Sequence, residues 1–296
     1  MQPVRIGETV IETVVEMDYW PVEPTWLIPP ATHEGIAKEL SWMGPRLVEP
    51  GTNKLILSLH TYLIRTGRHT ILLDTCCGNG KERGGAYPFH MLDTPYLDRL
   101  AALGVKPEEV DFVMCTHLHA DHIGWNTHRL DGRWVPTFPN ARYIISREEH
   151  AYWDTAVKQV TEIPMAVAAY LDSVVPVLDS GQVVLVADED GSDLLGEQFR
   201  FFPLRGHTPG HTGLLFSDGN RQALLTGDAI HHAVQFPYPE WSSLGEVQAE
   251  AALASRLRIR DYCADADVLL LTGHFPAPTA GRVVSHGSSA RFQFLE

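Results

Sequence analysis

The sequence has few cysteines and no long apolar run. Its four cysteines among 296 residues include no CxxC pair, so the disulfide framework of small secreted domains is excluded and we expect free thiols. No apolar stretch approaches the ~18 residues that a membrane-spanning helix needs. The first residues, MQPVRIGETVIE, have neither a basic leader nor an apolar segment typical of secretion. We therefore expect a cytoplasmic protein with no membrane partner.

Basic charge is also scarce. Twenty-three Lys and Arg residues stand against 37 Asp and Glu, which gives a formal net charge of −14. Such a chain repels phosphate backbones and offers no basic stripe, so we expect no nucleic-acid partner. Hydrophobic residues make up 44% of the chain, which is enough for a substantial core.

Short apolar runs alternate with segments of helical spacing. Strands are predicted at 55–64, 70–73, 112–115, 143–145, 183–186, 199–202, 214–216, 223–225 and 268–271, and helices at 95–103, 147–160 and 246–264. The two halves repeat one pattern, which favours an α+β fold of the αββα sandwich type: two packed mixed sheets with helices on both outer faces. We expect a single domain over 1–296, with 1–50 as an N-terminal extension.

The stretch THLHADHIGW places three histidines and an aspartate within residues 117–122. If Cys115 ends a strand, these residues form a loop at the sheet edge, where neighbouring side chains point in different directions. His117 and His119 can then face one metal ion, and Asp121 and His122 another. Each site needs about three protein donors plus an open position, so further donors must come from downstream.

Three later segments offer such donors. The turn GHTPGH at 206–211 follows the FRFFPL run, TGD at 226–228 follows QALL, and TGH at 272–274 follows VLLL. Each has a small residue and a donor directly after a strand. This repeated placement predicts that the donors gather along one edge of the fold.

Together, HxHxDH at 117–122, GHTPGH at 206–211, Gly-Asp at 227–228 and Gly-His at 273–274 resemble the metal signature of the metallo-β-lactamase-fold hydrolases. The resemblance extends from Leu55 to the C-terminus. Within that superfamily, GDAIHHAVQF (227–236) and GHFPAPTAGRV (273–283) look most like the branch that holds methyl parathion hydrolase and the quorum-quenching lactonases.

The resemblance implies a dinuclear metal site. One ion would be held by His117, His119 and His207, the second by Asp121, His122 and His274, with Asp228 bridging both. Imidazole and carboxylate donors suit zinc, and also iron, manganese or cobalt. The resemblance also implies that Asp121 relays a proton to the leaving group.

Three residues near these donors have open roles. His211, the second histidine of its turn, is expected to support the loop rather than bind metal. Asp74 is either a strand-end turn residue or a support that orients a ligand histidine. His231 stands where the family's well-known lactonases have a tyrosine that contacts substrate, so it is either a substrate contact and proton donor or a structural histidine.

Aromatic residues cluster in segments near the motifs. We expect Trp26, Trp125, Phe236 and Trp241 to form an apolar wall of the substrate pocket, with ordinary loop packing as the alternative. The Trp- and Pro-rich N-terminal segment either lines this pocket or forms a homodimer contact.

Two divalent cations about 3.5 to 4 Å apart share a water molecule and lower its pKa towards neutrality. The resulting reaction is hydrolysis, and we expect a carboxylic ester or lactone as the small-molecule substrate, with phosphotriesters as side substrates. Cleavage of a β-lactam or a thioester is the alternative; the lack of a secretory leader argues against the former, and the lack of a basic glutathione-binding tail against the latter. A diiron redox protein would normally carry a glutamate in place of His119, and a non-catalytic binding protein would normally have lost donors.

Overall fold

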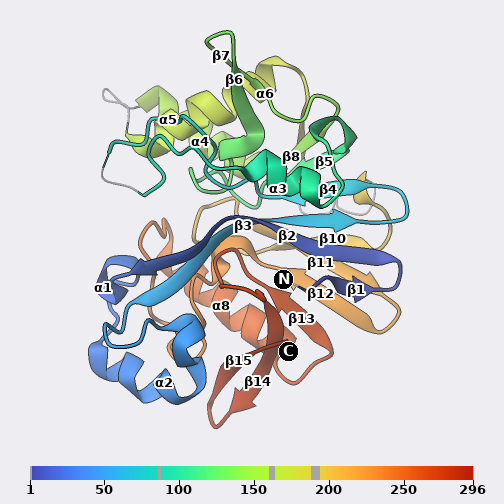
Figure 1. The fold of residues 1–296 in the computed structure, drawn as a ribbon. Helices are drawn as coiled ribbons and strands as arrows, with labels where there is room; N and C mark the ends of the chain where they lie inside the picture. Colours follow the sequence, from blue (N-terminus) through green and yellow to red (C-terminus); the bar gives the residue numbers. More distant parts are fainter. Residues whose placement is uncertain (1, 86–87, 160–163, 188–193, 296) are drawn as a thin grey trace. The chain divides into compact units, whose positions relative to one another are not determined.

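The computed structural model describes residues 2–85, 88–159, 164–187 and 194–295 (Figure 1). The chain forms two compact units. Unit 1 comprises Met1–Gln2, Met17–Ser58 and Gly191–Glu296, and unit 2 comprises Pro3–Glu16 and Leu59–Asp190. Residues 1–50, predicted as an N-terminal extension, therefore contribute to both units.

A seven-stranded mixed sheet has the order β1-β2-β3-β4-β5-β8-β9. Its strands are β1 Val4–Ile6, β2 Thr9–Val22, β3 Leu55–Arg65, β4 Thr70–Leu73, β5 Phe112–Met114, β8 Arg142–Ser146 and β9 Val183–Val186. From β4 to β9 all neighbours are parallel, which fits their nearly continuous apolar sequences. The carboxyl ends of β4 and β5 consequently meet at one edge.

Unit 1 contains a six-stranded sheet of order β10-β11-β12-β13-β14-β15. Its strands are β10 Phe199–Pro203, β11 Thr212–Asp218, β12 Arg221–Leu225, β13 Val268–Leu271, β14 Ala280–His286 and β15 Ser289–Phe294. Only β12 and β13 pair in parallel among these strands, with Leu225 opposite Leu271. A separate hairpin in unit 2 joins β6 Thr127–Leu130 to β7 Arg133–Pro136.

Helices pack against each sheet. The helices are α1 Pro24–Leu27, α2 His33–Leu47, α3 Tyr96–Ala102, α4 Arg147–Gln159, α5 Met165–Ser173, α6 Val175–Asp179 and α8 Ala249–Cys263, and the short 3-10 turns are η1 Pro107–Glu109, η2 Gly124–Asn126, η3 Gly227–Ala229 and η4 Ala233–Gln235. In unit 2, α4 contacts β8 and β9; in unit 1, α8 contacts β13 and β14. The predicted α+β class with two mixed sheets is confirmed.

Most predicted elements are present, with shifted ends. The helix predicted at 246–264 begins only at Ala249, because Gln248, whose N–H donates to the Gly206 carbonyl, is held in a non-helical conformation with φ −133° and ψ 83°. The helix predicted at 147–160 ends at Gln159, and Val160 lies outside the described residues.

The core of unit 1 is apolar and draws on α2, η4, α8 and the inner faces of β13 to β15. Phe275 packs edge-on against Phe292 with ring centroids 4.9 Å apart. All four cysteines are free and buried, as expected, and burial raises the pKa of Cys115 to about 12. In the described part of the chain no helix combines the length and apolarity that crossing a membrane requires.

Candidate metal centre

Four predicted donors lie in unit 2, in the loop that follows β5. His117 and His122 are buried, whereas His119 and Asp121 are partly exposed. The His117 ring lies 4.7 Å from the His119 ring and 4.2 Å from the His122 ring, centroid to centroid. Asp121 Oδ2 lies 3.7 Å from His122 Nε2. The crowded motif thus folds back on itself and brings its three imidazoles together.

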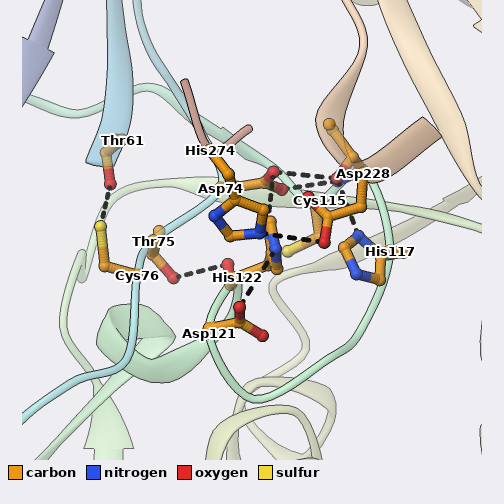
Figure 2. Close-up of polar contacts among 12 residues, drawn as sticks. Thr61, Asp74, Thr75, Cys76, Cys115, His117, Asp121, His122, Asp228 and His274 are labelled. Atoms are coloured by element: carbon orange, nitrogen blue, oxygen red, sulfur yellow. Dashed lines mark hydrogen bonds and ion pairs between the residues drawn. The ribbon is translucent and has the colours of Figure 1, made fainter. Parts of the chain in front are cut away.

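Asp74, directly after β4, contacts this loop from the neighbouring strand. Its Oδ1 accepts a hydrogen bond from Thr116 N at 2.7 Å, and its Oδ2 accepts one from Thr116 Oγ1 at 2.8 Å. Oδ2 also lies 2.9 Å from His122 Nδ1 (Figure 2). An ionised carboxylate only accepts hydrogen bonds, so His122 carries a proton on Nδ1 and donates it to Asp74.

Asp74 acts on His117 through Thr116. The Thr116 hydroxyl has one proton and donates it to Asp74, so it accepts from His117 Nδ1, which lies 3.1 Å away. His117 therefore also carries a proton on Nδ1. Asp74 is both a strand-end residue and a support of two histidines, which combines the two alternatives left open by the sequence.

A helix anchors the same loop. The Glu149 carboxylate in α4 accepts hydrogen bonds from Leu118 N at 3.1 Å and Trp153 Nε1 at 2.8 Å. The Trp153 ring, only 5% exposed, meets the His119 ring edge-on at 5.7 Å. Sequence reasoning missed both residues, although their i,i+4 spacing on a predicted helix was a usable signal.

In unit 1 the parallel pair β12 and β13 places two predicted donors together. Asp228 follows β12 and His274 follows β13, and the loops are joined by the hydrogen bond from Gly273 N to Gly227 O at 3.1 Å. His274 Nε2 lies 3.0 Å from Asp228 Oδ2 (Figure 2). Its Nδ1 lies 3.1 Å from the Ser58 carbonyl. The carbonyl can only accept, so Nδ1 carries the proton.

Two glycines permit these close approaches. A Cβ at Gly273 would lie 2.6 Å from Asp228 Oδ1, where the carboxylate stands. Gly206 has φ +126°, and a Cβ there would lie 2.0 Å from Ala252 N, so α8 could not pack against the GHTPGH turn. Both positions therefore require glycine.

The two histidines of that turn have different surroundings. His207 Nε2 lies 3.6 Å from Asp228 Oδ2. His211 Nε2 instead accepts a hydrogen bond from the Asp228 backbone N–H at 3.1 Å, and its carbonyl accepts from Leu204 N at 3.1 Å. His211 thus contacts the loop that carries Asp228.

His231 lies at the same carboxylate. It is 4% exposed, with Nε2 3.2 Å from Asp228 Oδ2 and Nδ1 2.9 Å from Ser243 Oγ. Ser243 Oγ donates in turn to Glu246 Oε1 at 2.8 Å, and Glu246 forms a buried ion pair with Arg256. Sequence reasoning missed these three partners, although SLGE at 243–246 has the S-x-x-E pattern of a capping box.

The predicted pocket aromatics lie in different surroundings. Phe236 stacks on Phe292 at 6.2 Å, and Trp241, 8% exposed, stacks on Tyr238 at 4.1 Å, so their contacts are those of core residues. Trp26 in α1 is 40% exposed.

Trp125 in η2 is also buried. Its Nε1 donates to Glu16 Oε1 at 2.7 Å, and with Met91 and Leu92 it lines a surface cavity of about 480 Å³ in unit 2.

The donor chemistry fits a divalent metal. Histidines that bind metals almost always donate their second ring N–H to a carboxylate, carbonyl or similar acceptor. His122, His117 and His274 all show this arrangement, with Asp74, Thr116 and Ser58 as acceptors. The free cysteines offer no competing thiolate, since burial raises the pKa of Cys76 and Cys77 well above its usual value.

A named lactonase is similar to this chain in sequence. The N-acyl homoserine lactonase AttM of Agrobacterium fabrum is 30% identical over 191 residues, covering 62% of this chain and 65% of the relative. The aligned segment thus spans just under two thirds of that relative's length.

Two solved structures are similar in fold. The hydrolase AbOPH of the beta-lactamase superfamily has a TM-score of 0.80 at 23% identity, covering 99% of this chain and 97% of its own. AidC, a dizinc quorum-quenching lactonase solved with a homoserine product, has a TM-score of 0.76 at 22% identity, covering 100% and 97%. The model of the metallo-beta-lactamase superfamily matches residues 57–280. The chain, with its strand-end histidines and aspartates, belongs to the metallo-beta-lactamase superfamily.

Proposed function

We propose that this protein is a dinuclear metal-dependent hydrolase that opens a lactone or a related carboxylic ester. The observation that carries the proposal is the set of buried imidazoles whose Nδ1 atoms contact a carboxylate, a hydroxyl and a backbone carbonyl, which is the arrangement typical of metal-binding histidines. Membership of the superfamily and the lactonase relatives support the reaction class.

We assign the donors as the sequence suggests. His117, His119 and His207 would hold one ion, Asp121, His122 and His274 the other, and Asp228 would bridge them. The donors fit zinc, and the dizinc centre of the similar fold AidC supports that choice. Bound cations would supply an ionised water molecule and stabilise the negative charge that develops on the carbonyl oxygen.

Asp121 suits the role of proton relay. Its side chain is 17% exposed, whereas that of its neighbour His122 is 3% exposed. A carboxylate that bridges the buried donors and solvent can pass a proton to the leaving alkoxide and exchange it with water. We therefore propose that Asp121 protonates the alkoxide that leaves when the ring opens, which gives the product hydroxyl.

His231 is the proposed substrate contact in place of a tyrosine. Its ring is fixed through Ser243, so Nε2 keeps one position beside Asp228. Trp26, exposed in α1, is proposed as an apolar contact for the acyl chain or as part of a homodimer contact.

A substrate screen of zinc-reconstituted protein tests this proposal. The compounds are N-hexanoyl homoserine lactone, a p-nitrophenyl ester, a phosphotriester, a β-lactam and a thioester, and each is followed to kcat/KM. We expect the lactone or the ester to rank first and phosphotriesters to be slower. The metal-free protein and Asp228→Ala serve as controls. A first rank for the β-lactam or thioester, or undiminished turnover by both controls, would overturn the proposal.

A further inference from the structure

Unit 1 by itself gathers several imidazoles around one carboxylate oxygen. The Nε2 atoms of His274, His231 and His207 lie 3.0, 3.2 and 3.6 Å from Asp228 Oδ2. His207, Asp228 and His231 each offer a ligand atom, and these atoms lie within 4.8 Å of one another. His231 is not one of the seven donors assigned above, yet its Nε2 lies about as close to Asp228 Oδ2 as those of the assigned donors His274 and His207.

The hydrogen bonds of His231 are those of a metal ligand. Ser243 Oγ donates its single proton to Glu246 Oε1, so it accepts from His231 Nδ1. The other ring nitrogen, Nε2, lies 3.2 Å from a carboxylate oxygen of Asp228. An imidazole nitrogen and a carboxylate oxygen this close can both bind one cation, and both are donors that suit zinc.

One short segment fixes both His231 and His207. Ser243 holds the His231 ring, and four residues later Val247 N donates to the carbonyls of His207 at 3.0 Å and Gly206 at 3.1 Å. Glu246, between them, is locked by Arg256, and both side chains are no more than 2% exposed. A donor set held in this way is preorganised, because little order must be gained when an ion binds.

We propose that His207, Asp228 and His231 form a metal site contained within unit 1, which takes one divalent cation of the zinc type. In the form loaded with a single ion, His231 is then a metal donor in addition to the seven, and its role as a substrate contact belongs to the form loaded with two ions. The inference rests on the proposed dinuclear centre for His207 and Asp228, which both sites share. It implies that a singly loaded form exists, in which the first ion needs only unit 1.

The first-ion affinity tests this site without any turnover assay. Metal-free protein is titrated with Co²⁺ against a chromophoric chelator, and the visible absorption of the first equivalent is recorded. Losing the hydrogen-bond partner of a metal ligand typically weakens metal affinity by roughly 10–100-fold. We expect Ser243→Ala, which removes such a partner, to weaken the first-ion affinity by about 10-fold. We expect His231→Phe, which removes the ligand itself, to weaken it by at least about 100-fold. His286→Phe, at an exposed histidine, is the matched control and should leave it unchanged.

Unchanged first-ion affinity and absorption in folded His231→Phe would refute the site. If that variant does not fold by circular dichroism, His231→Gln, which keeps a polar side chain of similar length, and Ser243→Ala decide the outcome by the same titration. An affinity loss with no lactone turnover by the wild type would reject the proposed function but keep the site. Lactone turnover by the wild type without an affinity loss in His231→Phe would keep the proposed function but reject the site.

Discussion

Replacing Asp74 by asparagine should weaken metal binding by two of the proposed ligands, His122 and His117, because it changes which ring nitrogen carries the proton. Asp74 Oδ2 accepts from both Thr116 Oγ1 and His122 Nδ1, at 2.8 and 2.9 Å. An amide nitrogen in that position can only donate. His122 would then have to accept on Nδ1 and carry its proton on Nε2, the nitrogen that the metal needs.

Asp74→Asn should also change which ring nitrogen of His117 carries the proton. Thr116 Oγ1, no longer donating to a carboxylate, becomes free to donate to His117 Nδ1 across 3.1 Å, which favours the same unsuitable tautomer. Rotating the asparagine amide by 180° does not avoid this effect. Its nitrogen would then take the place of Oδ1, which lies 2.7 Å from Thr116 N, and two N–H donors would face each other. Partners of this kind are worth roughly 10–100-fold in metal affinity, which is about 1.4–2.7 kcal/mol.

Competition with a chromophoric chelator measures this loss for each zinc equivalent. Asp98→Asn, which removes an exposed carboxylate from α3, is the control for the change in net charge. Circular dichroism and urea unfolding of the metal-free proteins separate a binding defect from unfolding. If Asp74→Asn bound both equivalents as tightly as the wild type, the tautomer argument would be wrong.

Three further outcomes are expected. Gly273→Ala should lower zinc affinity, measured by the same competition, because its Cβ would lie 2.6 Å from Asp228 Oδ1. Glu246→Gln should reduce the free energy of unfolding in urea by about 3–5 kcal/mol, because Arg256 would be left as a buried unpaired charge. Burial lowers the pKa of His232 to about 4, and its Nδ1 accepts from Val234 N. The unfolded chain binds a proton near pH 6.5 and the folded chain does not, so metal-free protein should lose about 3 kcal/mol of stability between pH 6.5 and 4. His232→Asn, which keeps an acceptor for Val234, should lack this loss.

The donors in unit 1 could be placed from sequence because strand pairing dictates their positions. Asp228 and His274 follow two apolar runs, and β12 and β13 pair in parallel, so their ends coincide. The supporting partners were harder to predict. The Ser58 carbonyl that holds His274 is a backbone group, which any residue supplies, and it lies 216 positions away in the chain.

Other features had a sequence signal that was not used. β2 begins TVIETVV, in which six of seven residues are the β-branched Thr, Val or Ile that favour strands. The helix expected from Glu246 starts later because Gln248 is held in a non-helical conformation and bonds to the Gly206 carbonyl, a contact set by tertiary packing rather than by helical spacing.

The most direct test of the central claim is proton release from N-hexanoyl homoserine lactone, followed while zinc is added in steps to metal-free protein. A dinuclear hydrolase predicts that turnover rises until two equivalents per chain are bound and then stays constant. Turnover that is independent of zinc, or a fully loaded protein that opens neither the lactone nor an aryl ester, would contradict it.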